Sequence, residues 1–263
     1  MLRVGLVGVG VVGKAFANAL GLMSRNTLSL YDPKQNLNDD ISDCDVVYVS
    51  VYFDKDNTDI LSQAVEQTVA KNKKGLIVIR STVMPSTTDS LIRKYDRPFA
   101  FMPEFLKEAT SVEDALRPDK IVIGVHDQED YNKILLSLGS QAAAGSIIPI
   151  IKMKPIEAEI TKLACNMIRL NKVILADEIA TLCEKSNADY YKLLEAFKCD
   201  WAINPNHLDP YHGGSRGAGG RCLPKDAEML QEACKRTGML SSIIDTVIKT
   251  NKSILGKPIK KAR

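Results

Sequence analysis

The chain has 263 residues, enough for one large domain or two smaller ones, and 45% of them are hydrophobic. Its 35 Lys and Arg nearly balance its 32 Asp and Glu, which argues against a dedicated nucleic-acid-binding protein. No apolar run is long enough to span a membrane, so we expect a cytoplasmic protein that does not bind membranes. The six cysteines are scattered without metal-ligand spacing, so we expect neither disulfide bonds nor a metal site.

The N-terminal segments predict a dinucleotide-binding unit. Residues 2–7 are predicted to form a buried strand and residues 14–22 a helix, and between them lies a GxGxxG pattern made by Gly8, Val9, Gly10, Val11, Val12 and Gly13. The first glycine permits a tight turn, the second lets a pyrophosphate approach the backbone, and the third lets the helix pack on the strand. A second strand, 27–31, ends in Asp32, whose carboxylate suits the ribose hydroxyls of NAD and repels the 2′-phosphate of NADP. We therefore predict NAD as the cofactor; Lys34 lies near its adenosine end or is simply a solvated lysine.

Further predicted elements extend this sheet to residue 152. Strands are expected at 45–51, 75–80, 98–101 and 146–150, and helices at 57–73 and 127–138. Ligands bind beyond the carboxyl ends of the strands in such sheets, which places four residues near the nicotinamide: Ser50, Val51, Ser81 and Thr82. A helix cap at Ser86 or Thr87 explains the end of the segment 81–86 equally well.

A polar segment follows the predicted strand 98–101. It contains Glu104, Phe105, Leu106, Lys107 and Glu108. The two carboxylates stand four residues apart after a strand end, which favours a functional role over an ordinary surface helix.

The longest periodic segment, 155–186, predicts a central helix shared between domains or subunits. Glu159, Lys162 and Asn166 fall on one of its faces, although Lys162 taken alone is most simply a surface lysine. Helices at 189–198 and 241–254, with a third after Cys222, make a second, all-helical domain of residues 153–263.

A glycine-rich stretch, 213–220, leads to Cys222 and then to a helix with Pro224 in its first turn and Gly238 at its end. A cysteine just before a helix N-terminus, beside Arg221 and Lys225, is favoured as a thiolate. The glycines leave the backbone room to approach a ligand closely. We interpret Cys222 as a nucleophile; the alternative is a flexible surface loop that happens to contain a cysteine.

Residues 217–226, GAGGRCLPKD, closely resemble the GFGGxCxPKD signature of the UDP-glucose/GDP-mannose dehydrogenase family. The segments 81–86, 102–109 and 158–166 resemble the family's STVxPG, NPEFLxEG and aEliKyaxN in the same order, and the resemblance runs from residue 2 to about residue 254. The fold that it implies is α/β, a Rossmann-type doubly wound parallel sheet followed by a long central helix and a small all-helical domain.

The resemblance implies a four-electron, NAD-dependent oxidation of the C6 alcohol of a nucleotide sugar, with UDP-glucose as the first choice. Cys222 would carry a thiohemiacetal and then a thioester, Lys162 and Asn166 would donate to the developing oxyanion, and Asp226 with Glu108 would handle protons and water. Thr82 and Glu108 would also border the nicotinamide, and Lys225 would contact NAD or the loop. The sugar nucleotide would meet residues 104–108, Lys162, Asn166, Tyr211, His212, Gly213, Gly214, Ser215 and Gly219. By the same analogy, helix 155–186 would form a homodimer.

The chain also departs from the family pattern. Ala218 replaces an aromatic residue of the signature, the VPTP-like run of the family is altered after Val51, and the chain stops before the family's third domain, which holds the nucleotide. Two alternatives therefore stay open. One is a two-electron β-hydroxyacid dehydrogenase, which needs no nucleophilic cysteine; the other is a shortened relative that binds NAD without turnover or acts only with a partner.

Overall fold

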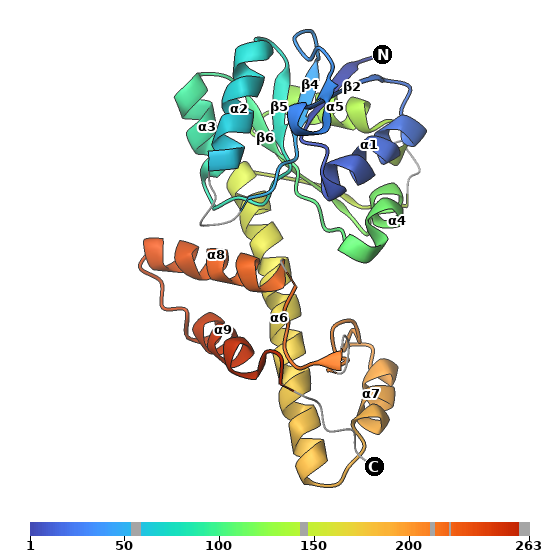
Figure 1. Cartoon of the computed structure of the whole chain (residues 1–263), viewed down its shortest axis with the longest axis vertical. Helices are drawn as coiled ribbons and strands as arrows, with labels where there is room; N and C mark the ends of the chain where they lie inside the picture. Colours follow the sequence, from blue (N-terminus) through green and yellow to red (C-terminus); the bar gives the residue numbers. More distant parts are fainter. Residues whose placement is uncertain (54–58, 143–146, 211–213, 221, 258–263) are drawn as a thin grey trace. The chain divides into compact units, whose positions relative to one another are not determined.

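The computed structural model describes residues 1–53, 59–142, 147–210, 214–220 and 222–257. The chain divides into two compact units, Met1–Lys162 and Leu163–Arg263, which are described separately below. Figure 1 shows both units and the helix α6 (Pro155–Lys185), which begins in the first unit and continues into the second. The boundary therefore lies inside this helix, ten residues after the predicted end of the first domain at residue 152.

Within the described residues, the first unit contains an eight-stranded sheet in the order β3-β2-β1-β4-β5-β6-β7-β8. The strands are β1 (Arg3–Val7), β2 (Thr27–Asp32), β3 (Leu37–Asn38), β4 (Val46–Val49), β5 (Leu76–Ile79), β6 (Phe99–Phe101), β7 (Ile121–Gly124) and β8 (Ile150–Met153). All neighbouring pairs are parallel except β2 with β3 and β6 with β7. Every residue of β4 and β5 is buried and apolar, as expected for parallel strands covered on both faces. This is the predicted Rossmann-type sheet.

Five helices of the first unit accompany the sheet: α1 (Val11–Met23), α2 (Asp59–Lys71), α3 (Thr87–Tyr95), α4 (Ser111–Leu116) and α5 (Gln128–Leu138). Phe16 of α1 and Ile134 of α5 belong to one core cluster with Tyr48 of β4, so these two helices cover the same face. The strand predicted at 146–150 is wrong in position, because β8 begins at Ile150 and the preceding residues 147–149 are irregular.

The second unit is built on the rest of α6, with α7 (Tyr190–Cys199), α8 (Leu223–Arg236) and α9 (Ser242–Ile254). One core cluster joins α6, α8 and α9 through Leu170, Ala227 and Val247, and another joins α6 to α7 through Ala180 and Leu194. Because α6 packs on two sides, its apolar residues recur too broadly for a helix with one buried stripe. Among the helices in the described ranges, none is both long and apolar enough to cross a membrane.

Candidate functional site

The turn between β1 and α1 shows why its three glycines are needed. Gly8 has φ +85°, and a side chain there would lie 2.6 Å from the Ser50 carbonyl oxygen. A side chain at Gly13 would overlap the Gly8 carbonyl oxygen, so this glycine sets the close approach of α1 to the turn. At Gly10 a Cβ would meet nothing within 4 Å, so the backbone is open there. An opening at the second glycine is what a pyrophosphate requires.

The N-terminus of α1 is suited to an anion. Its N-cap is Gly10, no side chain caps it, and its first turn contains no acidic residue. The backbone N–H groups of such a helix start carry a partial positive charge, which attracts phosphate. A cavity of about 300 Å³ lies at this end of the sheet. Its wall includes Gly8, Gly10, Tyr31, Asp32, Lys34, Ser50 and Val51.

Asp32 fixes the glycine turn. Its Oδ2 accepts hydrogen bonds from the Val9 backbone N–H at 2.8 Å and from the Gln35 side chain at 2.9 Å. The same Gln35 amide nitrogen donates to the Val9 carbonyl oxygen at 2.7 Å. Within the described residues, Oδ1 of Asp32 has no hydrogen-bond partner, which leaves it available to a ribose hydroxyl. Sequence reasoning missed Gln35, whose only signal was its position three residues after Asp32; Lys34 is exposed at the cavity edge.

Ser81 and Thr82 follow β5 at the carboxyl end of the sheet, as predicted from the sequence. The Ser81 hydroxyl donates to the Val51 carbonyl oxygen at 2.7 Å, and its oxygen also accepts from the Val51 N–H at 2.9 Å. Both bonds hold the segment after β4 beside the segment after β5. The structure therefore gives Ser81 a bracing role, while Thr82 is half-buried beside it.

The N-terminus of α3 is capped by a residue that is distant in the sequence. Ser86 is the N-cap residue, at the position that the sequence indicated, with φ +74°, but its side chain makes no capping bond. Instead the Glu159 carboxylate accepts from the Ser86 N–H at 2.6 Å, the Thr88 N–H at 2.8 Å and the Thr88 hydroxyl at 2.6 Å. Burial raises the pKa of Glu159, although these hydrogen bonds oppose the rise.

Glu104 and Lys162 form a buried ion pair in the first unit. Lys162 is 3% exposed, and its ammonium donates to Oε1 of Glu104 at 2.9 Å and to the Glu104 backbone oxygen at 2.7 Å. Glu104 also accepts from the Leu106 N–H through its other oxygen at 2.7 Å. Burial pushes the pKa of Glu104 up, but Lys162 and the Leu106 N–H outweigh it, and the pKa is lowered. Two of the three donors of Lys162 are thus used within the described protein.

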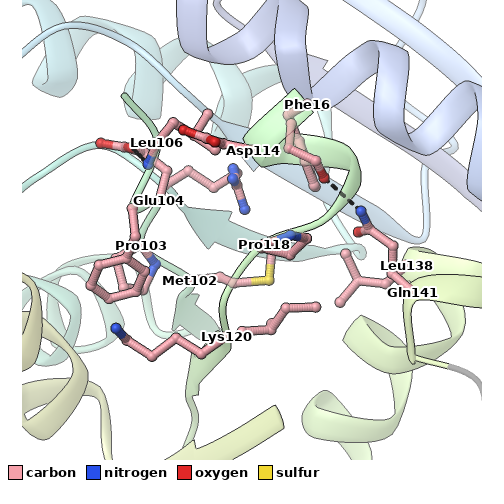
Figure 2. Close-up of a pocket in the computed structure, with 14 residues that line it drawn as sticks. Phe16, Met102, Pro103, Glu104, Leu106, Asp114, Pro118, Lys120, Leu138 and Gln141 are labelled. Atoms are coloured by element: carbon pink, nitrogen blue, oxygen red, sulfur yellow. Dashed lines mark hydrogen bonds between the residues drawn. The ribbon is translucent and has the colours of Figure 1, made fainter. Parts of the chain in front are cut away.

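A small cavity lies behind the segment 103–106 (Figure 2). Its volume is about 40 Å³, which is room for water but not for a sugar. The Arg80 guanidinium lies against its wall, 3.7 Å from the centre of the Phe16 ring, and burial lowers the pKa of Arg80 to about 10. Lys120 lies over the Phe105 ring at 4.2 Å. The Lys120 side chain therefore packs against the segment through Phe105, while Lys107 of the same segment is exposed.

In the second unit, Cys222 immediately precedes α8 and is exposed. One turn into the helix, the buried Asp226 accepts a 2.6 Å hydrogen bond from the Asn166 side chain. Its other oxygen forms an ion pair with the Lys225 ammonium at 2.8 Å. Arg169 donates to the Asn166 amide oxygen at 2.8 Å. Sequence reasoning missed Arg169, although it lies one turn beyond Asn166.

Only some of the loop glycines give open backbone. A side chain at Gly217 (φ +75°) would approach the Asn251 amide oxygen at 3.0 Å, and one at Gly219 would approach Leu255 at 3.2 Å. At Gly214 and Gly220 there is nothing within 4 Å. Gly217 and Gly219 therefore lie close to α9 and the residues after it, and the approach of a ligand to this loop backbone stays a prediction.

Several predicted site residues lie outside the described part of the chain: Tyr211, His212, Gly213 and the Glu108 side chain. Ser215 is half-buried. In the ranges that the structure covers, no group of three His, Cys, Asp or Glu is placed to hold a metal ion.

Comparisons with known proteins match both units. The model for the NAD binding domain of the UDP-glucose/GDP-mannose dehydrogenase family matches residues 20–138, and the model for the central domain of the same family matches residues 156–253. A UDP-glucose 6-dehydrogenase of Rickettsia bellii is 35% identical over 189 residues, 69% of this chain and 42% of that protein. A GDP-mannose 6-dehydrogenase of Pseudomonas putida is 30% identical over 193 residues, 69% of this chain and 42% of that protein.

Among solved structures, a UDP-glucose dehydrogenase from Pyrobaculum islandicum is similar with a TM-score of 0.79 and 24% identity, over 96% of this chain and 68% of that one. That likeness supports the Rossmann fold. The alignments span 42% of the length of the two curated relatives. Because the matched N-terminal domain is an NAD binding domain, the cofactor is NAD, and the open Gly10 and uncapped α1 fit it.

Proposed function

Because the chain belongs to the UDP-glucose/GDP-mannose dehydrogenase family, we propose that it oxidises the C6 alcohol of a nucleotide sugar to a carboxylate. The observation that carries this proposal is the placement of Cys222. An exposed cysteine stands at the start of α8, and the buried Asn166–Asp226 pair lies one helical turn further along. A two-electron alcohol oxidation needs neither a nucleophile nor this arrangement.

Two NAD+ molecules, bound one after the other, would each accept one hydride. The Cys222 thiolate adds to the intermediate aldehyde, forming a C–S bond and a thiohemiacetal whose oxidation leaves a thioester. Water then breaks the C–S bond and releases the carboxylate and the thiol. Asp226 would take a proton from this water, and Asn166 and Lys162 would donate to the developing oxyanion.

For the cofactor, we propose that Gly10 and the N-terminus of α1 receive the pyrophosphate and that Asp32 receives the adenosine ribose. Thr82 and Glu108 would border the nicotinamide. The sugar nucleotide would meet the segment 104–108, with UDP-glucose proposed first because the Rickettsia relative is named for it. GDP-mannose is the competing substrate, since a Pseudomonas relative is named for that sugar nucleotide.

The test is the number of NADH molecules formed per sugar consumed, with UDP-glucose and GDP-mannose in separate reactions. We expect two with one of the donors. Cys222→Ser should abolish acid formation, whereas Cys199→Ser, at another exposed cysteine, should leave it unchanged. Acid formation by the Cys222 variant at the wild-type rate would refute the assigned nucleophile.

A second candidate is an NAD-binding protein that turns over only with a partner chain. The alignments with the two curated relatives cover 42% of each, so the activity of a whole relative is itself a proposal for these residues. Under this alternative, NAD raises the melting temperature of the chain but no sugar nucleotide yields NADH. Recovery of activity on addition of a separately produced chain would establish it.

We also propose a homodimer built on α6. Three exposed apolar side chains, Ile168, Leu175 and Leu182, recur at seven-residue intervals along this helix. That spacing puts them on one stripe, as in helices that pair along their length. A monomeric mass by light scattering at micromolar concentration would count against this assembly.

A further inference from the structure

The segment that leads to Cys222 is held by two helices before it reaches the cysteine. We call residues 216–218 the anchor segment. They contact α6 through Arg216 and Gly217, and α9 through Ala218. All of these contacts lie within the second unit.

On the α6 side, the anchor is a buried ion pair network. Arg216, 8% exposed, donates to Oδ1 of Asp177 at 3.0 Å and to Oε1 of Glu184 at 2.6 Å. Oδ2 of Asp177 accepts from the Gly217 backbone N–H at 2.8 Å. Asp177 is 2% exposed, so one carboxylate fixes both the side chain and the backbone of the anchor segment. Removing one member of such a network leaves an uncompensated buried charge.

On the α9 side, the side-chain amide of Asn251 pairs with the backbone of the anchor segment. The Asn251 side chain, 3% exposed, accepts from the Ala218 N–H at 2.8 Å and donates to the Ala218 carbonyl oxygen at 3.1 Å. This is the two-point pairing that a neighbouring strand would give. The left-handed φ of Gly217, and the Asn251 amide oxygen 3.0 Å from where a Cβ would stand, explain why a glycine precedes Ala218.

From these contacts we infer that Asp177 and Asn251 are positioning residues for Cys222. Only four residues separate Ala218 from the first residue of α8, Leu223. The helix end of this span is fixed by the Asn166–Asp226 bond, and the other end is fixed by the anchor segment. Cys222 is the N-cap residue of α8, and we expect the two fixed ends to restrict its side chain to the region of the helix start, whose N–H groups favour a thiolate. The catalytic meaning of this inference rests on the proposed function; its effect on the thiol does not.

The test measures the thiol directly. Wild type, Asn251→Leu and the milder Asp177→Asn are treated with iodoacetamide across a pH series, and mass spectrometry gives the alkylation rates of Cys222 and Cys199 in each sample. Cys199 is exposed on α7, away from the anchor contacts, and is the internal reference. Ser253→Ala is the matched control, because its hydroxyl bonds only to Thr250 within α9.

We expect Asn251→Leu to raise the pH midpoint of Cys222 alkylation by about half a unit, which slows the reaction at neutral pH about threefold relative to Cys199. Asp177→Asn should act in the same direction, and Ser253→Ala should change nothing. Hydrogen exchange must show that the Ala218 amide has lost protection in the Asn251 variant. If that protection is lost while the midpoint and the Cys222 to Cys199 ratio stay at wild-type values in both variants, the inference is overturned.

Turnover separates this inference from the proposed function. In an active chain, Asn251→Leu should lower kcat about tenfold with little change in the KM for the sugar, because the nucleophile is displaced and the substrate contacts are not. If the wild-type chain forms no NADH with any sugar nucleotide, the proposed function fails, and the alkylation result still decides the role of the anchor. If the chain is active and the variant keeps full kcat, Asn251 has no positioning role.

Discussion

Replacing Glu104 with Gln tests the buried ion pair that it forms with Lys162. The substitution removes one negative charge and keeps the shape of the side chain. Lys162 is only 3% exposed, so water cannot replace the lost charge. The amide oxygen of Gln and the backbone oxygen of residue 104 can both still accept from the ammonium, but the amide nitrogen then faces the Leu106 N–H, which loses its acceptor.

The size of the loss in stability depends on which hydrogen-bond acceptors of Lys162 remain in the variant. Deleting one partner of a buried ion pair costs about 3–5 kcal/mol when no acceptor is left. Because two acceptors survive here, we expect a loss of about 2 kcal/mol in the free energy of unfolding, the difference between a charged and a neutral hydrogen bond.

The effect must also depend on pH. The pKa of Glu104 is below its ordinary value of 4.5 in the folded chain, so its carboxylate stabilises the fold above that value. This stabilisation is lost as the pH falls through the folded-state pKa, where wild type itself becomes neutral at this position. The difference between wild type and Glu104→Gln should therefore be about 2 kcal/mol near pH 7 and shrink below about pH 4.

Urea titration followed by circular dichroism, at pH 7 and below about pH 4, measures this difference in the free energy of unfolding. Glu113→Gln, at an exposed carboxylate of the same unit, should change stability by less than about 0.5 kcal/mol. A cycle with Lys162→Met isolates the pair, and its coupling energy should also be about 2 kcal/mol. An equal loss at both pH values, or a coupling energy near zero, would refute the reasoning.

Three further variants test the remaining features. Gly13→Ala should destabilise the fold by about 2 kcal/mol or more because its methyl group overlaps a backbone oxygen, whereas Gly10→Ala should leave the melting temperature unchanged and abolish its rise with NAD. Arg169→Met should lower kcat about tenfold through loss of the Asn166 orientation, and Arg169→Lys should restore part of it; equal kcat for Met and wild type would contradict this role. Leu175→Lys should halve the mass seen by light scattering if α6 forms the dimer, and an unchanged dimer would place the interface elsewhere.

Local chemistry explains what the sequence predicted well. The tight turn at Gly8, the packing at Gly13 and the opening at Gly10 each depend on neighbours within a strand-turn-helix unit. The glycine pattern alone is therefore enough to predict the geometry of this turn. The strands of the sheet were predicted from apolar runs of the right length. The placement of Cys222 before α8 followed in the same way from Pro224.

Contacts between residues far apart in the sequence explain the features that the sequence did not predict. Glu159 caps α3 from 71 residues away, and no local pattern distinguishes it from other acidic residues of a helix. Asn251 lies 33 residues from Ala218, and Asp177 lies 39 from Arg216. The local pattern of glycines therefore does not show that a side chain of α9 lies next to Gly217.

The bonds around Asp32 have a kinetic consequence. The Val9 N–H and the Gln35 side chain hold the glycine turn in place through hydrogen bonds within the protein. A preorganised loop loses little conformational entropy when its ligand arrives, so NAD association should need no slow rearrangement. Stopped-flow traces should then show one exponential phase whose rate rises linearly with NAD concentration, without the plateau that a rate-limiting isomerisation imposes.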